Sequence, residues 1–423
     1  MDKTNMKPES LMMTYGYKPE LSEGAVKCPI FQTSTFVFKT AEEGKAFFEL
    51  AYGLREKEPK EELGLIYSRI NNPNLEILEN RLCLWDKADD CAVFESGMSA
   101  ISTVLLEFLN PGDLLVYSNP IYGGTDHFIH HFLKKIGVHT LGFMPNQSAD
   151  QIKQLIVDSG YADKLAMIFL ETPANPTNDL EDIQMIVDDV VSEFSNPDKK
   201  IIVAVDNTYM GPLWQHPLQL GADLALYSAT KYIGGHSDLI AGAVLGNSEV
   251  IGRVKTLRTF LGNMVSPHTA WLMLRSLETL KVRMDKQCEN AQKVALYLKN
   301  HPAVVKVNYL GLLDQNSEYY HIYSKQCSAP GAMISFYTIG DEQEAFQFLN
   351  ELKLIKLAVS LGSTESLAEH PRSMTHAGVD PEELELMSIT PSLIRISIGV
   401  EAAEDLITDL EQALAKITLP ELH

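Results

Sequence analysis

Hydrophobic positions between residues 75 and 246 follow two patterns that alternate along the chain. Short continuous apolar runs are typical of buried strands, and apolar residues recurring every three or four positions are typical of helices. The predicted strands cover residues 91–96, 111–120, 138–144, 164–173, 201–207, 222–230 and 238–246. The predicted helices cover residues 75–85, 96–109, 126–137, 149–160 and 180–194. This alternation indicates parallel βαβ units, so we expect an α/β fold whose central, mostly parallel sheet is flanked by helices.

The two ends of the chain follow other patterns. Residues 266–302 predict one long helical region, and beyond it short strands (331–339, 393–399) mix with helices (341–353, 404–417), which indicates a smaller α+β domain. The first 70 residues are irregular and contain a charged stretch, 55–64, that predicts a solvated insertion or a short helix. We therefore expect an N-terminal arm (1–72), an α/β domain (73–265) and a C-terminal α+β domain (266–423).

Composition narrows the classes of function. The chain has 423 residues, of which 45% are hydrophobic, and its formal charge of 35 − 56 = −21 opposes binding to nucleic acid or to anionic lipid. It contains neither a long apolar stretch nor an apolar signal core. The five cysteines are widely spaced without a CxxC pair, which predicts reduced thiols and a cytoplasmic protein rather than disulfides or a zinc site.

Four features with chemical potential follow predicted strands, and the strand ends of an open α/β sheet are where such folds bind ligands. Gly97 and Met98 begin a helix, where exposed backbone N–H groups favour an anion. Asp206 ends an apolar strand. A carboxylate buried there must either pair with another group or take part in function, because an unpaired buried charge is costly. Taken alone, the glycine turn is usually only a turn, and the aspartate is more often a cap or an ion pair.

The other two features are a lysine and a tyrosine. Lys231 follows another apolar strand, where burial lowers the pKa of an amine and frees it as nucleophile or base. Just before it, Ser228 and Thr230 offer hydroxyl groups to a phosphate, and Tyr122 in a glycine turn can stack on a ring. Each of these two residues also has a purely structural interpretation. The lysine then only extends its charged end from the rim of the sheet, and the tyrosine is only an aromatic residue in a turn. Together with the first two features they match pyridoxal 5′-phosphate (PLP), which needs a lysine, a carboxylate for the ring nitrogen and a phosphate cradle.

Specific motifs extend this match over nearly the whole chain. The sequence resembles the Cys/Met-metabolism (trans-sulfuration) family of fold-type I PLP enzymes, which includes methionine γ-lyase, cystathionine γ-synthase, the cystathionine lyases and the O-acylhomoserine sulfhydrylases. The motifs are YSRINNPN (67–74), ESGMSA (95–100), YGGT (122–125), ETPANPT (171–177), VDNTY (205–209), SATKYIGGHSD (228–238), VSLGSTESL (359–367), HPRSMTH (370–376) and LIRISIGVE (393–401). Relative to typical members, residues 55–64 look like an insertion.

The resemblance implies a role for each matching residue. Lys231 is expected to bind the cofactor covalently, Asp206 to pair with the pyridine nitrogen, and Tyr122 to stack on the ring and move a proton. Residues expected to hold the phosphate are Gly97, Met98, Ser228 and Thr230, with Tyr67 and Arg69 reaching the phosphate of a neighbouring subunit. The family likeness therefore implies a homotetramer built from two active dimers. Arg395 is expected to bind the α-carboxylate of the substrate, beside Asn175 and Ser360.

The exact reaction is less determined than the family. We expect a carbon–sulfur lyase that releases an oxo acid, ammonia and a thiol from cystathionine or methionine. Val359 stands where synthases and many cystathionine γ-lyases carry Glu, which favours a small thioether tail, whereas Gly124 replaces the Cys of typical methionine γ-lyases. β- and γ-elimination therefore both stay open.

Other activities remain as alternatives to the lyase. A γ-replacement enzyme of the cystathionine γ-synthase or sulfhydrylase type is the main one; an aminotransferase and a non-catalytic PLP-binding homologue are more remote. The histidines of the helix at 126–137 lie three and four residues apart, but no carboxylate or cysteine pattern completes a metal site, so we expect no metal.

Overall fold

A computed structural model describes residues 6–58, 61, 64–196 and 199–417. Its centre is a seven-stranded sheet in the order β1-β7-β6-β5-β4-β2-β3. The strands are β1 (Asp90–Phe94), β2 (Leu114–Ser118), β3 (His139–Phe143), β4 (Leu165–Glu171), β5 (Ile202–Asp206), β6 (Leu224–Ser228) and β7 (Gly242–Gly246). Only β7 runs antiparallel to its neighbours, so the expected mostly parallel sheet is confirmed. β7 reverses direction because the segment after β6 returns without a crossover helix.

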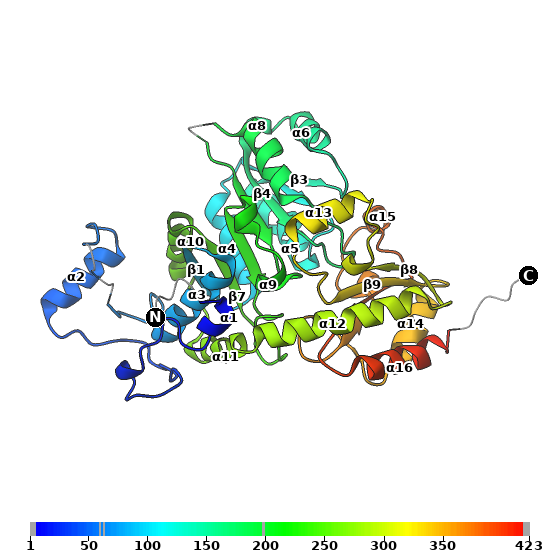
Figure 1. Ribbon diagram of the computed structural model, residues 1–423. Helices are drawn as coiled ribbons and strands as arrows, with labels where there is room; N and C mark the ends of the chain where they lie inside the picture. Colours follow the sequence, from blue (N-terminus) through cyan, green and yellow to red (C-terminus); the bar gives the residue numbers. More distant parts are fainter. Residues whose placement is uncertain (1–5, 59–60, 62–63, 197–198, 418–423) are drawn as a thin grey trace, which may run out of the picture.

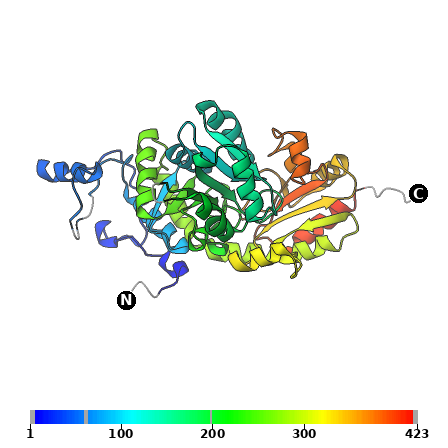
Figure 2. The same cartoon turned by 90° about the horizontal axis from the view of Figure 1, so that it is seen from above.

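Helices cover both faces of this sheet (Figures 1 and 2). α4 (Gly97–Phe108) and α10 (Ser248–Leu261) pack on one face, and the sequence patterns did not predict α10. α6 (Ala149–Asp158) and the segment α7 (Ile183–Met185), η6 (Ile186–Val191) and α8 (Ser192–Phe194) pack on the other. The expected helix at 126–137 is present as α5 (Gly123–His127), η3 (Phe128–Leu133) and η4 (Lys134–Ile136), and the helix at 75–85 as α3 (Pro73–Asp86). Apolar strands are buried between these layers, which leaves their carboxyl ends as the place for a site.

A second, five-stranded sheet lies beside the first in the order β10-β11-β12-β9-β8. Its strands are β8 (Val304–Asn308), β9 (Met333–Thr338), β10 (Lys356–Leu357), β11 (Leu367–Glu369) and β12 (Leu393–Ser397). α12 (Leu280–Lys299), α14 (Glu342–Glu351) and α16 (Ala403–Leu414) pack against it. The single helical region expected over 266–302 is divided into α11 (Pro267–Leu277) and α12, because Thr279 leaves the helical conformation between them (φ −112°, ψ 5°).

The N-terminal segment extends from the side of the molecule opposite the second sheet (Figures 1 and 2). It is not wholly irregular, since α1 (Pro8–Leu11) and α2 (Ala41–Ala51) form there, and Thr40 caps α2 by accepting the N–H of Glu43. In the charged stretch 55–64, residues 59, 60, 62 and 63 lie outside the described residues, and the others form no helix. Among the described residues, no helix is both long and apolar enough to span a membrane.

Candidate active site

A cavity of about 280 Å³ lies at the carboxyl ends of β4, β5 and β6, where the two sheets meet. Eleven of the thirteen residues predicted for the site line it: Gly97, Met98, Tyr122, Asn175, Asp206, Ser228, Thr230, Lys231, Val359, Ser360 and Arg395. The other two, Tyr67 and Arg69, do not line it. Residues more than 200 positions apart in sequence therefore meet in one cavity, as the strand-end argument predicts.

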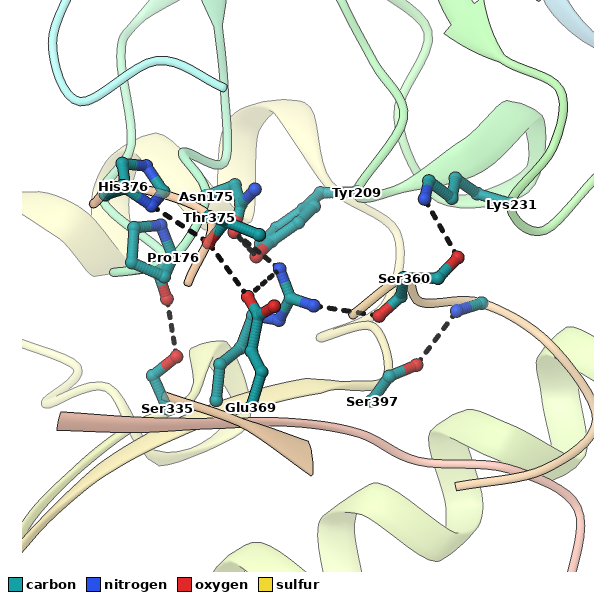
Figure 3. Close-up of polar contacts among 12 residues, drawn as sticks. Asn175, Pro176, Tyr209, Lys231, Ser335, Ser360, Glu369, Thr375, His376 and Ser397 are labelled. Atoms are coloured by element: carbon teal, nitrogen blue, oxygen red, sulfur yellow. Dashed lines mark hydrogen bonds and ion pairs between the residues drawn. The ribbon is translucent and has the colours of Figure 1, made fainter. Parts of the chain in front are cut away.

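Lys231 lies in the connection between β6 and β7. Its Nζ donates a hydrogen bond to Ser360 Oγ at 2.9 Å, which links the first sheet to the second (Figure 3). Burial, with the positive charge of Arg395 as a smaller cause, lowers the pKa of Lys231 to about 8. A substantial fraction of this amine is thus neutral near physiological pH and can act as a nucleophile or a base.

Asp206 ends β5 and is 6% exposed. One carboxylate oxygen accepts both the backbone N–H of Thr208 at 3.0 Å and its hydroxyl hydrogen at 2.6 Å. Burial raises the pKa of Asp206, while the Thr208 hydrogen bonds and the charge of Lys231 oppose that rise. The carboxylate is thus held in place by one oxygen, and a cationic ring nitrogen in the cavity would satisfy its charge.

The start of α4 provides a cradle for an anion. A Cβ at Gly97 would lie 2.8 Å from Ser228 Cβ, so only glycine lets the helix start approach β6 this closely. Ser96 caps the helix by accepting the N–H of Ser99, which leaves the first amide groups directed toward the cavity end. The Thr230 hydroxyl both donates to and accepts from the backbone of Ala241, so its phosphate contact would share that hydroxyl.

Arg395 rises from the middle of the second sheet and is 3% exposed. Its Nη1 donates to Asn175 Oδ1 at 2.9 Å and lies 2.7 Å from Glu369 Oε1, and its Nη2 donates to the carbonyl of Ser360 at 2.8 Å. Glu369 lies directly opposite Arg395 in the antiparallel pair β11–β12. A fixed, charge-balanced guanidinium at this position is suited to binding a carboxylate.

Tyr122 precedes α5 and remains 40% exposed at the cavity. Burial of its hydroxyl, followed by the charges of Glu171 and Glu369, raises the pKa of Tyr122. A Cβ at Gly124 would lie 2.6 Å from the tyrosine ring, so a larger residue there requires the ring to move. The glycine that departs from the methionine γ-lyase pattern therefore affects how the ring is placed.

The structure adds residues that the sequence reasoning missed. Glu171, Thr208, Tyr209 and Thr375 line the cavity, and Glu369 contacts Arg395 beneath it. Glu171 and Tyr209 lay inside motifs already singled out, and Glu171 ends an apolar strand just as Asp206 does. That shared position was the sequence feature that could have found it.

Comparison with known proteins decides the family. The family model described as "Cys/Met metabolism PLP-dependent enzyme" matches residues 9–415. The chain belongs to this family. It is 39% identical over 396 residues to L-methionine gamma-lyase of Treponema denticola (93% of each chain), and 36% identical to cystathionine gamma-lyase of Bacillus subtilis (97% of this chain, 100% of the relative). The structure of cystathionine gamma synthase from Xanthomonas oryzae pv. oryzae, in complex with aminoacrylate and cysteine, superimposes with a TM-score of 0.85 at 31% identity, covering 97% and 98% of the two chains.

These comparisons confirm the predicted fold-type I PLP enzyme and the class of carbon–sulfur lyase. The cavity fits the cofactor on its own chemistry: a low-pKa amine, a buried carboxylate with room for a cationic partner, and a glycine cradle at a helix start. Lys231 would hold the aldehyde end of PLP, Asp206 its ring nitrogen, and the start of α4 with Ser228 its phosphate.

Proposed function

We propose that this enzyme performs γ-elimination on L-methionine, converting it with water to 2-oxobutyrate, methanethiol and ammonia. The proposal rests on which charged side chains line the cavity and on the group that each of them already binds. Among the described lining residues, the charged ones are Glu171, Asp206, Lys231 and Arg395, and each is committed to the cofactor, to the α-carboxylate or to another lining residue. None is left for the distal amino acid group of cystathionine, whereas Val359 suits a methylthio tail.

The names of the relatives support the same choice. The relative from Treponema denticola is named L-methionine gamma-lyase, as are those from Fusobacterium nucleatum subsp. polymorphum and Pseudomonas putida, at 38–39% identity. The structural similarity to a cystathionine γ-synthase keeps γ-replacement as the alternative, since that reaction uses the same amine, carboxylate and arginine.

The roles follow from the contacts. When bound, PLP withdraws electrons from the substrate α-carbon. Arg395 binds and orients the α-carboxylate, with Asn175 beside it. With the cofactor bound, Lys231 would remove the α-proton as a base, and Ser360 holds its amine toward the second sheet. Tyr122 moves protons at the side chain of the substrate from its place at the cavity edge.

Several finer expectations belong to the same proposal. Tyr67 and Arg69 complete the phosphate site of a neighbouring subunit, through an N-terminal arm (1–72) that precedes the α/β (73–265) and α+β (266–423) domains. The assembly is a homotetramer in the cytoplasm. Free cysteines throughout the described residues support a reducing compartment.

The first experiment identifies the oxo acid formed by the purified, PLP-loaded enzyme from L-methionine and from L-cystathionine. We expect 2-oxobutyrate with methanethiol from L-methionine, at a higher kcat/KM than for L-cystathionine. Pyruvate from L-cystathionine would establish β-elimination and reject the proposal. A thioether product formed only when cysteine and an activated homoserine are supplied would favour γ-replacement instead.

A further inference from the structure

Glu171 is a buried acid in the cavity that takes no part in the proposed proton transfers or in binding the α-carboxylate. It ends β4, is 5% exposed and lines the cavity. Its Oε2 accepts the backbone N–H of Tyr122 at 2.7 Å, and its Oε1 accepts the backbone N–H of Asn175 at 2.9 Å. One carboxyl group therefore joins the segment before α5 to the loop after β4. These two segments carry the ring-stacking tyrosine and the amide that contacts Arg395.

The neighbour of Glu171 in the sheet is Asp206. The parallel register of β4 and β5 places these two residues opposite each other, so two enclosed carboxyl groups share one edge of the sheet. Two such groups cannot both ionise cheaply. Asp206 receives two hydrogen bonds from Thr208 and the charge of Lys231, all of which favour its ionised form.

The surroundings of Glu171 favour the other state. Burial and the charge of Asp206 raise the pKa of Glu171 to about 8, against the opposing effects of the two backbone N–H groups and of Arg395. Two further titratable groups among the described residues, Tyr122 and Tyr209, interact with Glu171 and stay neutral because burial raises the pKa of each. A protonated carboxylic acid still accepts hydrogen bonds at both oxygens. Protonation of Glu171 therefore leaves the backbone N–H groups of Tyr122 and Asn175, and the loops that carry them, hydrogen-bonded.

We propose that Glu171 is a positioning residue that seats Tyr122 and Asn175 through their backbone amides and remains uncharged beside Asp206 before the cofactor binds. Asp206 is thereby left as the ionised partner for the ring nitrogen. A cationic ring nitrogen arriving at Asp206 then favours ionisation of Glu171, so cofactor binding releases a proton from this acid. The inference rests on PLP binding and is independent of which substrate the enzyme uses.

The test compares the dissociation constant of PLP for the full-length wild-type protein and for Glu171→Gln, from about pH 6.5 to about pH 9. Gln cannot titrate and accepts only one of the two N–H groups. The lost N–H acceptor should weaken binding at every pH. The ratio of variant to wild-type dissociation constants should then rise about tenfold toward high pH, because only wild-type Glu171 gains a negative charge there. The contribution of Lys231 is common to both proteins and cancels in the ratio.

Glu181→Gln is the matched control. Glu181 is another buried acid with a raised pKa, but it does not line the cavity, so its substitution should leave the ratio near one at every pH. A ratio of one for Glu171→Gln would overturn the proposal. A ratio above one that does not change with pH would show that Glu171 keeps one charge state over this range, and would overturn the proton release.

A measurement on the wild-type protein covers the case in which Glu171→Gln fails to fold. The infrared difference spectrum of the PLP-free protein between the same two pH values should show loss of a protonated carboxylic acid band, because Glu171 ionises in this range before the cofactor binds. Absence of that loss contradicts the proposal without any variant. Since neither readout involves turnover, failure of the methionine reaction would leave both unaffected.

Discussion

The cavity and the N-terminal arm differ in how far a single chain buries and contacts their side chains. In the cavity, Asp206 and Arg395 are 6% and 3% exposed and bonded to neighbours from both sheets. In the arm, Val37 is 96% exposed and Leu54 is 72% exposed. Tyr67 and Arg69 belong to this second region: both are exposed, and Arg69 donates to the carbonyl of Thr259 rather than to any cavity residue.

This difference separates two kinds of functional residue. The groups proposed to contact the ring, the amine and the α-carboxylate are placed by strand register within one chain, whereas the arm presents apolar side chains that proteins normally cover with a partner surface. Substitutions in the cavity should therefore act within a subunit. Substitutions in the arm should act between subunits.

The largest effect is expected at Lys231. Lys231→Ala removes both the proposed attachment point of the cofactor and the proposed base, so kcat should fall at least about a thousandfold. Steady-state oxo acid formation measures the loss, and circular dichroism checks that the fold is retained. Undiminished turnover by the variant would show that this cavity is not the catalytic site.

The second-largest effect is expected for the buried ion pair between Glu369 and Arg395, beneath the cavity. Glu369→Ala leaves the Arg395 guanidinium buried without its carboxylate, which should lower the free energy of unfolding by about 3–5 kcal/mol. Denaturant titration measures this change, and KM should also rise because Arg395 loses its fixed position. The exposed pair Lys281–Asp285 provides the control, since Asp285→Ala should leave stability nearly unchanged. Equal effects of the two substitutions would mean that Glu369 does not restrain Arg395.

The cavity residues show why sequence predicted part of the site. Asp206 ends one apolar strand and Lys231 follows another by three residues, so local pattern alone marks them, and parallel strands bring such positions together. Glu369 could not be found in this way, because its role depends on pairing with a strand that begins 24 residues later in the chain. The position of Glu171 at the end of an apolar strand was visible in the sequence, but its place opposite Asp206 needed the register between β4 and β5.

The fold also has features that local sequence pattern predicts and features that it does not. Continuous apolar strands and amphipathic helices were predictable because burial sets their periods. The reversed direction of β7 and the break at Thr279 depend on connections and tertiary packing, which local periodicity does not encode.

The arm offers a smaller but more selective test. Arg69→Ala should reduce kcat/KM about a hundredfold by removing the proposed phosphate contact. If Arg69 serves the neighbouring subunit, mixing this variant with Lys231→Ala after dissociation should restore activity, because each mixed dimer then contains one intact site. About a quarter of the wild-type activity is expected from an equal, random mixture. No recovery in verified mixed dimers would show that Arg69 does not serve the site of the neighbouring subunit and would remove the division between the two regions.

The smallest effect concerns the edge where cavity and solvent meet. Val359 is 53% exposed, lines the cavity and precedes the serine that holds Lys231. A carboxylate at position 359 can pair with the distal amino group of cystathionine, but it makes no favourable interaction with an uncharged methylthio tail. Val359→Glu should therefore move the ratio of kcat/KM values about tenfold toward L-cystathionine. Val359→Gln has nearly the same shape without charge and should move the ratio much less. If both variants alter the two substrates equally, the tail specificity is set elsewhere, and the neighbouring subunit's arm becomes the place to search.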